Sequence, residues 1–413
     1  MLDISFLDNP SQTYAWGSRT AIPEFLGREP STEPQAELWL GSHPKAPSRV
    51  SVGGRLIPLD QLIQRYTAQI LGPGHETLPF LLKVLAAEEP LSIQAHPDPQ
   101  QAAAGFAREE ALGIPRSAFE RNYRDANAKP ELIYALTPFR MLRGFRPAGA
   151  IRRGFEALGI LEDLPGADHL SASSPLALRA FFERYLPRTK AQKRALAPIL
   201  ARAVDGARQR ENDAPEFACI VELARFYPGD PGILAPLFLH WLELEPGQAI
   251  YTGAGILHAY LHGVGIELMI NSDNVLRGGL TPKHVDVPEL MRVLEFQPTP
   301  PDLLQPVRFG RGDERFSAPD GSFVLGRIHV EADRPREVAA GRVEVLLCYE
   351  GRGVLTNPES GLELDFSRGT SLLVPASVGH YRIHGDARLF SATSGCGSRP
   401  ENMAAILEAS VTA

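Results

Sequence analysis

The chain has 413 residues, of which 44% are hydrophobic and 22% are charged, and its formal net charge at pH 7 is −7. This length allows two or three domains with a substantial core, and the composition is ordinary for a globular protein. The acidic balance argues against a basic face for nucleic acid or an anionic membrane surface, and no apolar run reaches the ~18 residues of a membrane span. We therefore expect neither nucleic acid nor a membrane as a partner.

The N-terminus and the cysteines predict a cytoplasmic protein. Residues 1–10 lack the basic start and the apolar core of a secretory signal. Cys219, Cys348 and Cys396 are far apart and form no pair with metal-binding spacing. A sparse, odd number of cysteines fits a reducing compartment, in which we expect these thiols to be buried and inert. A zinc site, if present, must then use nitrogen and oxygen ligands.

Residues 1–145 are expected to form mainly short strands. The apolar run at 78–85 follows a Gly-Pro-Gly turn, and the 37 glycines and 36 prolines are spread along the whole chain. This distribution is typical of many strands joined by turns. We also expect a few short helices near residues 59–70 and 99–112.

Residues 146–240 have a different pattern, which predicts a helical insertion. Ser174 followed by Pro175 is a strong helix start, because the hydroxyl can cap a helix whose first turn accepts proline. Apolar residues then recur at helical spacing from Leu178 to Leu186, and residues 192–204 and 214–227 repeat an amphipathic pattern.

Strand patterns return at residues 242–251 and again from about 310 to 394, where alternating apolar residues are separated by glycine turns. Several short strands of this kind indicate a jelly roll. The predicted fold class is mainly β with an α-helical insertion: two cupin-type jelly-roll barrels plus a helical domain. The predicted domains are a catalytic, metal-binding barrel (1–145 and 241–309), the helical domain (146–240), and a C-terminal barrel without metal (310–413).

Three distant segments carry the residues of greatest chemical interest. They are Ser92–Asp98, Lys129–Leu132 and Gly253–Lys283. Gln94 and His96 are two positions apart, so both side chains face the same side of a strand, as an interior metal site requires. Taken alone, a Gln-x-His pair is a weak signal, since a strand histidine is more often packed in the core, and an acid such as Glu131 can be exposed.

These segments, together with residues 14–18, 36–44 and 78–81, resemble the type I mannose-6-phosphate isomerases. The resemblance covers most of residues 1–145 and about 242–296, in the family's order, and is weak elsewhere. It implies reversible conversion of mannose 6-phosphate to fructose 6-phosphate through a cis-enediol, in a chain that is a monomer. It further implies one zinc ion whose ligands are Gln94, His96, Glu131 and His258. Ligand type alone also allows manganese, iron or cobalt.

The resemblance also implies that Arg277 is a catalytic residue and that Ser92 and Lys129 contact the substrate. Four further residues match the family's pocket with less defined roles: Lys83, Glu267, Asp273 and Lys283. The alternatives are an ordinary ion pair of Arg277 with Asp273 or Glu267, and a solvated surface position for Ser92 and Lys129. His43, His262, His284 and His380 are expected to be structural or to lie behind the ligands.

Two questions stay open at the level of sequence. The general base is one of Lys83, Lys129, Glu267 and Asp273, which burial and neighbours can tune. Family members often carry histidine where this chain has Ala128, so a ring-opening role for that histidine cannot be transferred. Two rival functions are an iron-dependent cupin oxygenase, which would favour two histidines and one carboxylate, and a non-catalytic sugar-binding cupin.

Overall fold

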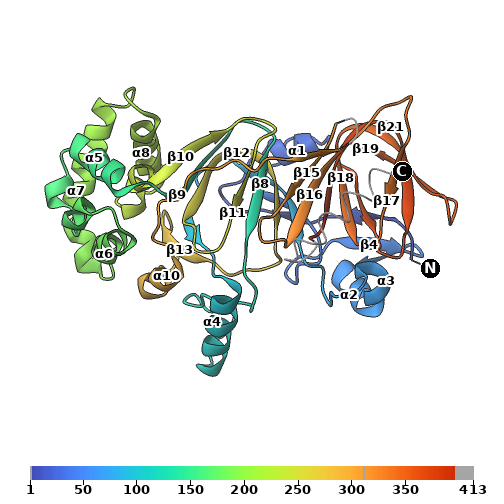
Figure 1. Cartoon of the computed structure of the whole chain (residues 1–413), viewed down its shortest axis with the longest axis horizontal. Helices are drawn as coiled ribbons and strands as arrows, with labels where there is room; N and C mark the ends of the chain where they lie inside the picture. The colour runs from blue at the N-terminus through green and yellow to red at the C-terminus, as the bar shows by residue number, and fades with distance from the viewer. Residues whose placement is uncertain (1, 310–311, 396–413) are drawn as a thin grey trace.

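The computed structural model describes residues 2–309 and 312–395, so Cys396 and the end of the predicted C-terminal barrel lie outside the described residues. Two curled sheets lie side by side, and a group of helices packs at one end of the molecule (Figure 1). This arrangement confirms the predicted fold class, mainly β with a helical region. Among the described residues, no helix has the length and apolar character needed to span a bilayer.

The first sheet carries the candidate site. Its main path runs in the order β10-β9-β12-β6-β3-β2, and β7, β8, β11 and β13 extend it through pairs with β12 and with one another. The long strand β12 is its centre, because it pairs with β6, β7, β8 and β9. The strands are β2 (Ser11–Gln12), β3 (Glu37–Leu40), β6 (Leu81–Ala87), β7 (Ile93–Ala95), β8 (Glu131–Ala135), β9 (Phe139–Phe145), β10 (Leu239–Leu244), β11 (Ala249–Thr252), β12 (His258–Met269) and β13 (Leu276–Gly279).

The second sheet is built mostly from the C-terminal part of the chain. Its path is β14-β15-β16-β21-β18-β20-β1-β4-β5, with β17 paired to β21 and β19 paired to β18. Its strands are β14 (Val307–Phe309), β15 (Asp313–Ser317), β16 (Phe323–Val330), β17 (Arg336–Ala339), β18 (Glu344–Asn357), β19 (Leu362–Ser367), β20 (Ser371–Val374), β21 (His380–Ser394), β1 (Ser5–Asp8), β4 (Arg49–Val52) and β5 (Arg55–Pro58).

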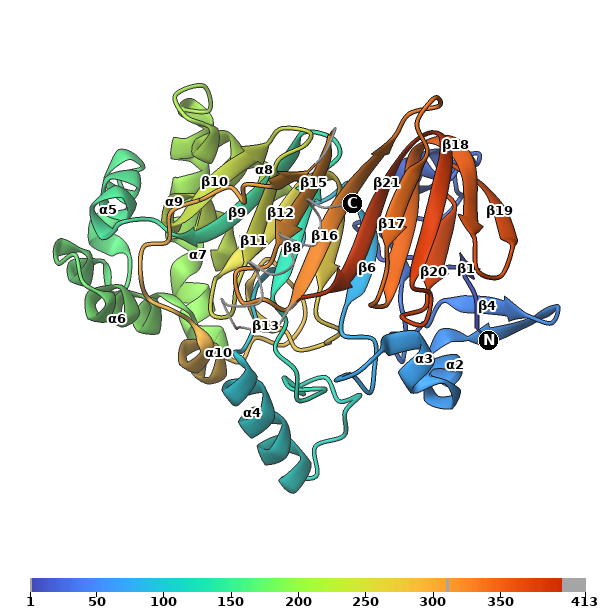
Figure 2. The same cartoon turned by 45° about the vertical axis from the view of Figure 1, so that its right-hand side comes forward.

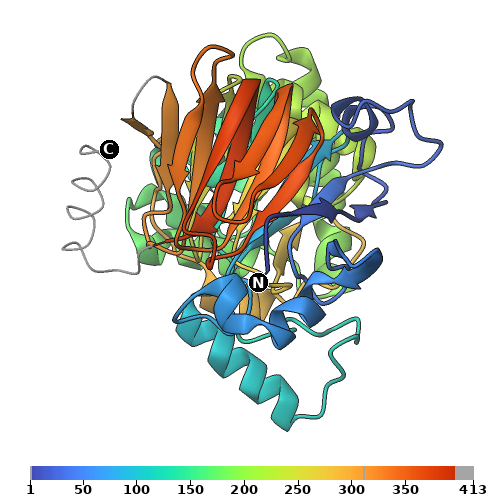
Figure 3. The same cartoon turned by 90° about the vertical axis from the view of Figure 1, so that its right-hand side faces the viewer.

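The N-terminus joins this second sheet. Ser5 and Phe6 of β1 pair with residues of β20, and the dark blue N-terminal segment runs beside the orange-red strands in Figure 3. Sequence order therefore does not assign every strand to a sheet. The predicted domain limits stay a prediction, since membership of a sheet does not by itself define a domain.

Helices occur over residues 148–238, where the hydrophobic spacing predicts them. Ser174 accepts a hydrogen bond from the backbone of Ala177 and so caps the helix that starts at Pro175. The helical region comprises α5 (Ala148–Ala157), η1 (Leu161–Asp163), η2 (Ala167–Ser171), α6 (Pro175–Tyr185), α7 (Lys190–Gln209), α8 (Pro215–Phe226), η3 (Pro231–Leu234) and α9 (Ala235–Phe238). Elsewhere lie α1 (Ala21–Phe25), α2 (Leu59–Arg65), α3 (Thr67–Leu71), α4 (Pro99–Ala111) and α10 (Val287–Val293). Of these, α1 and α10 were not expected from the sequence.

Several separate hydrophobic clusters hold these parts together. The helices pack on one side of the first sheet through a cluster that includes Phe145, Phe182 and Phe238. The two sheets pack on each other through a second cluster, in which the ring of Tyr134 contacts Phe316 and Phe390 edge-on. The first sheet is thus covered by helices on one side and by the second sheet on the other, as Figure 2 shows. A further small apolar cluster, which includes Leu85, Phe139 and Tyr260, lies within the first sheet.

Candidate active site

Strand pairing brings the three chemically interesting segments together. His258, the first residue of β12, lies opposite Gln94 of β7. Gln94 in turn lies opposite Arg277 of β13. Glu131, the first residue of β8, pairs with Thr252 of β11, six residues before His258 in the chain. Residues separated by more than 150 positions therefore meet inside the first sheet.

His96, Glu131 and His258 form a buried cluster that could hold a metal ion. The Nε2 atoms of His96 and His258 each lie 3.2 Å from a different carboxylate oxygen of Glu131. The ligand atoms of all three residues lie within 4.8 Å of one another. Both Nε2 atoms and Oε2 of Glu131 are buried without a hydrogen-bond partner. Because buried polar atoms without partners are costly, their convergence on one point fits a bound cation.

The surroundings fix the histidine tautomers that a metal requires. Nδ1 of His96 lies 2.7 Å from the carbonyl oxygen of Asn274, and Nδ1 of His258 lies 2.9 Å from that of Ile256. A carbonyl oxygen only accepts, so each Nδ1 carries the proton and each Nε2 presents a lone pair. Burial and the charge of Lys129 lower the pKa of His96 to about 4, so its ring is neutral at physiological pH.

Lys129 lies against the carboxylate of this cluster. Its Nζ is 2.5 Å from Oε1 of Glu131, and both side chains are buried. Burial alone would raise the pKa of Glu131, but Lys129 and the imidazole of His96 hold it well below its usual range. The carboxylate is therefore ionised, as a metal ligand must be. The alternative of a solvated amine for Lys129 is wrong.

A second buried ionic group involves Lys83. Its Nζ lies 2.8 Å from Oε2 of Glu267 and 3.3 Å from Oε1 of Glu37, while the indole of Trp39 donates to the other oxygen of Glu37. Burial alone would lower the pKa of Lys83, but the two carboxylates raise it above its ordinary value. Burial raises the pKa of Glu267. The charge of Lys83 opposes this shift, and the charge of nearby Glu131 adds to it. The Lys83 amine is therefore held in its protonated form.

The cations of the pocket form a third group. Burial lowers the pKa of Arg277, and the charge of Arg124 lowers it further. Partial desolvation of the exposed Lys283 lowers its pKa as well, as do the charges of Arg277 and Arg124. Among the ion pairs of the described residues, none involves Arg277. Clustered cations that lack a carboxylate partner form a favourable site for an anion.

Asp273 and Glu267, the two acids that could pair with Arg277, have other partners. Asp273 lies 2.8 Å from Nζ of Lys45 and 3.6 Å from Nε2 of His43, while Glu267 pairs with Lys83. Burial would raise the pKa of Asp273, but the contacts with Lys45 and His43 lower it. An ordinary ion pair for Arg277 with Asp273 or Glu267 is therefore wrong.

Comparison with known proteins agrees with this geometry. Residues 4–148 match the model of the phosphomannose isomerase type I catalytic domain. Over 396 residues the chain is 38% identical to mannose-6-phosphate isomerase of Escherichia coli (strain K12), an alignment that covers 93% of this chain and 97% of that relative. The chain belongs to the type I mannose-6-phosphate isomerases. It is therefore an enzyme with the isomerase activity of its family.

A more distant relative and a solved structure support the same family assignment. The mannose-6-phosphate isomerase of Homo sapiens is 30% identical over 410 residues, covering 89% of this chain and 92% of that protein. A crystal structure of mannose 6-phosphate isomerase in a holo, zinc-bound form has a TM-score of 0.86 and 35% identity, over 95% of this chain and 100% of that chain. The similarity to the type I isomerases thus includes the helical region and the second sheet, which the sequence motifs covered only weakly.

For Gln94 and Ser92, only strand pairing and alternation indicate which way the side chains face. Gln94 precedes His96 on the same face and lies beside His258 through strand pairing, while its neighbours Ile93 and Ala95 point into the core shared with the helices. Ser92 is half-buried, one residue before β7, and shares the face of Gln94 by alternation. Their roles as a ligand and a substrate contact stay predictions.

Four residues of the pocket have contacts that the sequence motifs did not assign to them. Glu37 and Lys45 lie in or beside the stretch 36–44 that resembles the type I family, so that stretch carried the signal, but nothing singled out these two side chains. Asn274 is fully buried and binds His96 through its carbonyl oxygen, while its side chain accepts hydrogen bonds from the backbone of Arg124 and Asp125. Arg124 has no sequence signal, because it lies in a loop whose position depends on that side chain.

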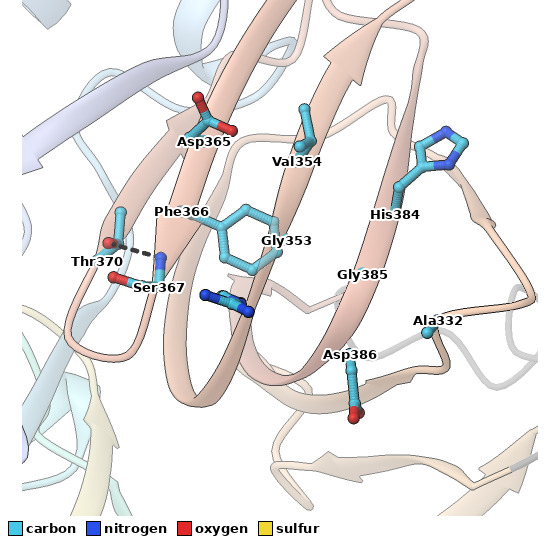
Figure 4. Close-up of a pocket in the computed structure, with 11 residues that line it drawn as sticks. Ala332, Gly353, Val354, Asp365, Phe366, Ser367, Thr370, His384, Gly385 and Asp386 are labelled. Carbon is cyan, nitrogen blue, oxygen red and sulfur yellow. Dashed lines mark hydrogen bonds between the residues drawn. The ribbon is translucent and has the colours of Figure 1, made fainter.

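A separate cavity lies in the second sheet, away from this pocket. It has a volume of about 620 Å³ and is lined by residues of β18, β19 and β21, by Thr370 and by Ala332. In Figure 4 the side chains of Asp365, His384 and Asp386 point in different directions. A site for a metal or a phosphate needs converging donors. The candidate active site of this isomerase therefore remains the buried cluster of the first sheet.

Proposed function

We propose that the chain converts mannose 6-phosphate to fructose 6-phosphate with one zinc ion held by Gln94, His96, Glu131 and His258. The observation that carries this proposal is the convergence of buried, unpartnered donor atoms of the two histidines and the carboxylate. Two nitrogens and two oxygens suit zinc, and related solved structures contain it. With one carboxylate and neutral partners, bound zinc would keep a net charge of about +1 and supply a Lewis acid for the sugar oxygens.

The reaction moves one proton between two carbons of the open-chain sugar. A base removes the proton from C2 of the aldose while O1 gains a proton, which gives a cis-enediol. Return of a proton to C1 and loss of the proton on O2 then give the ketose. Negative charge develops on O1 and O2 during these steps, so positive groups that face these oxygens lower the barrier. We assign this role to Arg277, next to Gln94 across the β7–β13 pair.

The remaining cations suit the phosphate group of the substrate. Arg124 and Lys283 lie close enough to Arg277 for their charges to perturb one another. The overall charge of the chain is negative, so a phosphorylated sugar needs such a local positive region to bind. We propose that Lys283 and Arg124 bind the phosphate and that Ser92 contributes a hydroxyl.

Charge state narrows the choice of general base. Lys83 is paired with two carboxylates that raise its pKa, so its ammonium cannot accept the proton. Asp273 has a lowered pKa and is therefore a weak base. Lys129 is held as a cation against the ionised carboxylate of Glu131, so the same argument disfavours it. Glu267 is the candidate that remains, since it is buried and its raised pKa favours proton uptake. Ala128 offers no group for ring opening, so that step falls to another group, to water or to spontaneous mutarotation.

Two further properties are proposed on other grounds. The buried, free thiols of Cys219 and Cys348 are compatible with a cytoplasmic location, since oxidising compartments favour paired cysteines. The monomeric state rests on the family resemblance alone.

The test is an isomerase assay that couples formation of fructose 6-phosphate to a reporter. We expect activity with mannose 6-phosphate, loss of at least about 90% of it after treatment with a chelator, and recovery when zinc is added back, because structural and catalytic zinc sites rebind their ion. Activity that persists after complete metal removal would contradict the proposal. Oxygen consumption by iron-loaded protein without isomerisation would favour the oxygenase.

A further inference from the structure

The backbone that follows Arg277 adopts an unusual conformation. A β-bulge interrupts the pairing of β13 with β7 between Arg277 and Gly279. Gly279 has a φ of +146°, and Leu280 has a φ of +52°. Leu280 is the only non-glycine residue with a positive φ in the described ranges 2–309 and 312–395. Left-handed backbone is unfavourable for leucine, and such a conformation persists only where the surroundings hold it. Bulges next to active sites commonly direct one side chain.

Asp230, in the loop before η3, holds this turn from the helical region. Its Oδ1 accepts a hydrogen bond from the backbone N–H of Leu280 at 3.0 Å and another from that of Gly232 at 2.7 Å. One carboxylate oxygen thus joins the strained residue to the start of η3. The carboxylate is half-buried and no ion pair competes for it among the described residues.

The two backbones also meet without space for side chains. A Cβ on Gly279 would lie 3.0 Å from the Cα of Gly232, and a Cβ on Gly232 would lie 2.9 Å from the backbone nitrogen of Leu280. The loop is anchored on its far side as well, because the buried hydroxyl of Tyr185 on α6 donates to the carbonyl oxygen of Pro231 at 2.5 Å. The turn after Arg277 therefore packs against a loop that is itself hydrogen-bonded to α6, and not against solvent.

We propose that Asp230 is a positioning residue, which fixes the direction of Arg277 by holding the Gly279–Leu280 turn in its strained conformation. This gives the helical region a part in catalysis, because Asp230 caps η3, whose residues Ile233 and Leu234 pack in the core of that region. The inference rests on the proposed role of Arg277. If Asp230 only capped η3, its removal would affect stability but not the geometry of the pocket.

The first test compares two substitutions of Asp230. In Asp230→Ala the turn loses its acceptor, and we expect kcat to fall roughly 10- to 100-fold with unchanged zinc content, since a misplacement of about 1 Å can cost that much. Asp230→Asn keeps an oxygen acceptor for both N–H groups and should stay within about threefold of the wild-type kcat. Ser174→Ala removes a comparable cap from α6, far from the turn, and should leave kcat unchanged.

A double-mutant cycle with Arg277→Ala separates positioning from general destabilisation. If Asp230 acts through Arg277, Asp230→Ala should cause no further loss in the Arg277→Ala background, because coupled residues are not additive. An equal fold-loss in both backgrounds, or wild-type kcat in Asp230→Ala, would overturn the inference while leaving the role of Arg277 intact. Full activity of Arg277→Ala alone would instead overturn the proposed function of that residue.

Discussion

Replacing Glu131 with alanine is expected to abolish isomerase activity and zinc binding together. The carboxylate is the charged member of the cluster and lies 3.2 Å from the free nitrogen of each histidine. Its loss would also leave Lys129 buried without its partner. We expect at least a 10³-fold fall in kcat/KM, which is about 4 kcal/mol of transition-state stabilisation at ~1.36 kcal/mol per factor of ten. Zinc content by elemental analysis and the coupled assay measure the two effects.

A matched pair of variants separates metal loss from unfolding. Glu131→Gln keeps the shape and an oxygen for Lys129 but removes the charge, so it should fold and bind zinc more weakly. Glu344→Gln alters a half-buried carboxylate, which accepts a hydrogen bond from the hydroxyl of Tyr381 in the second sheet. This control should retain both zinc and activity. A Glu131→Ala protein that keeps stoichiometric zinc would contradict the ligand assignment.

Replacing Arg277 with alanine is expected to lower kcat by about 10²- to 10³-fold while zinc stays bound, as for the loss of a single oxyanion-stabilising donor. Arg277 is half-buried, lacks an ion-pair partner among the described residues, and lies beside Gln94 through the pairing of β7 and β13. Arg277→Lys should recover only part of the rate, because lysine cannot reproduce the planar, bidentate geometry of a guanidinium.

The appropriate control for Arg277 is an arginine outside the pocket. Arg388 is paired with Glu350 on the second sheet, so Arg388→Ala should not change kcat. Steady-state kinetics and zinc analysis on the same preparations would decide the matter. Wild-type kcat in Arg277→Ala would remove this residue from the mechanism.

Local chemistry explains which parts of the fold could be predicted. The cap at Ser174 and the periodic apolar residues after it determine a helix over a few turns, and the structure places α6 there. Alternation along a strand is equally local, so the shared face of Gln94 and His96 follows from their spacing. The resemblance to a known family supplied the other two proposed ligands, Glu131 and His258, which no local rule connects to Gln94 and His96.

What could not be predicted depends on contacts between distant residues. The pairing of β1 with β20 joins residues more than 360 positions apart, and no pattern in either segment specifies the other. Arg124 enters the pocket because the buried side chain of Asn274 holds its loop. Likewise, the charge state of Lys83 follows from Glu37 and Glu267, which reach it from two other strands. The interaction between two charges depends on the distance between them and on their burial, and the sequence gives neither.

Zinc-edge anomalous diffraction from a crystal of the active protein tests the central claim most directly. We predict one peak per chain, about 2.0–2.2 Å from Nε2 of His96 and of His258 and from oxygens of Glu131 and Gln94. An active crystal whose zinc peak lies elsewhere, or which has no metal peak near these four side chains, would contradict the account.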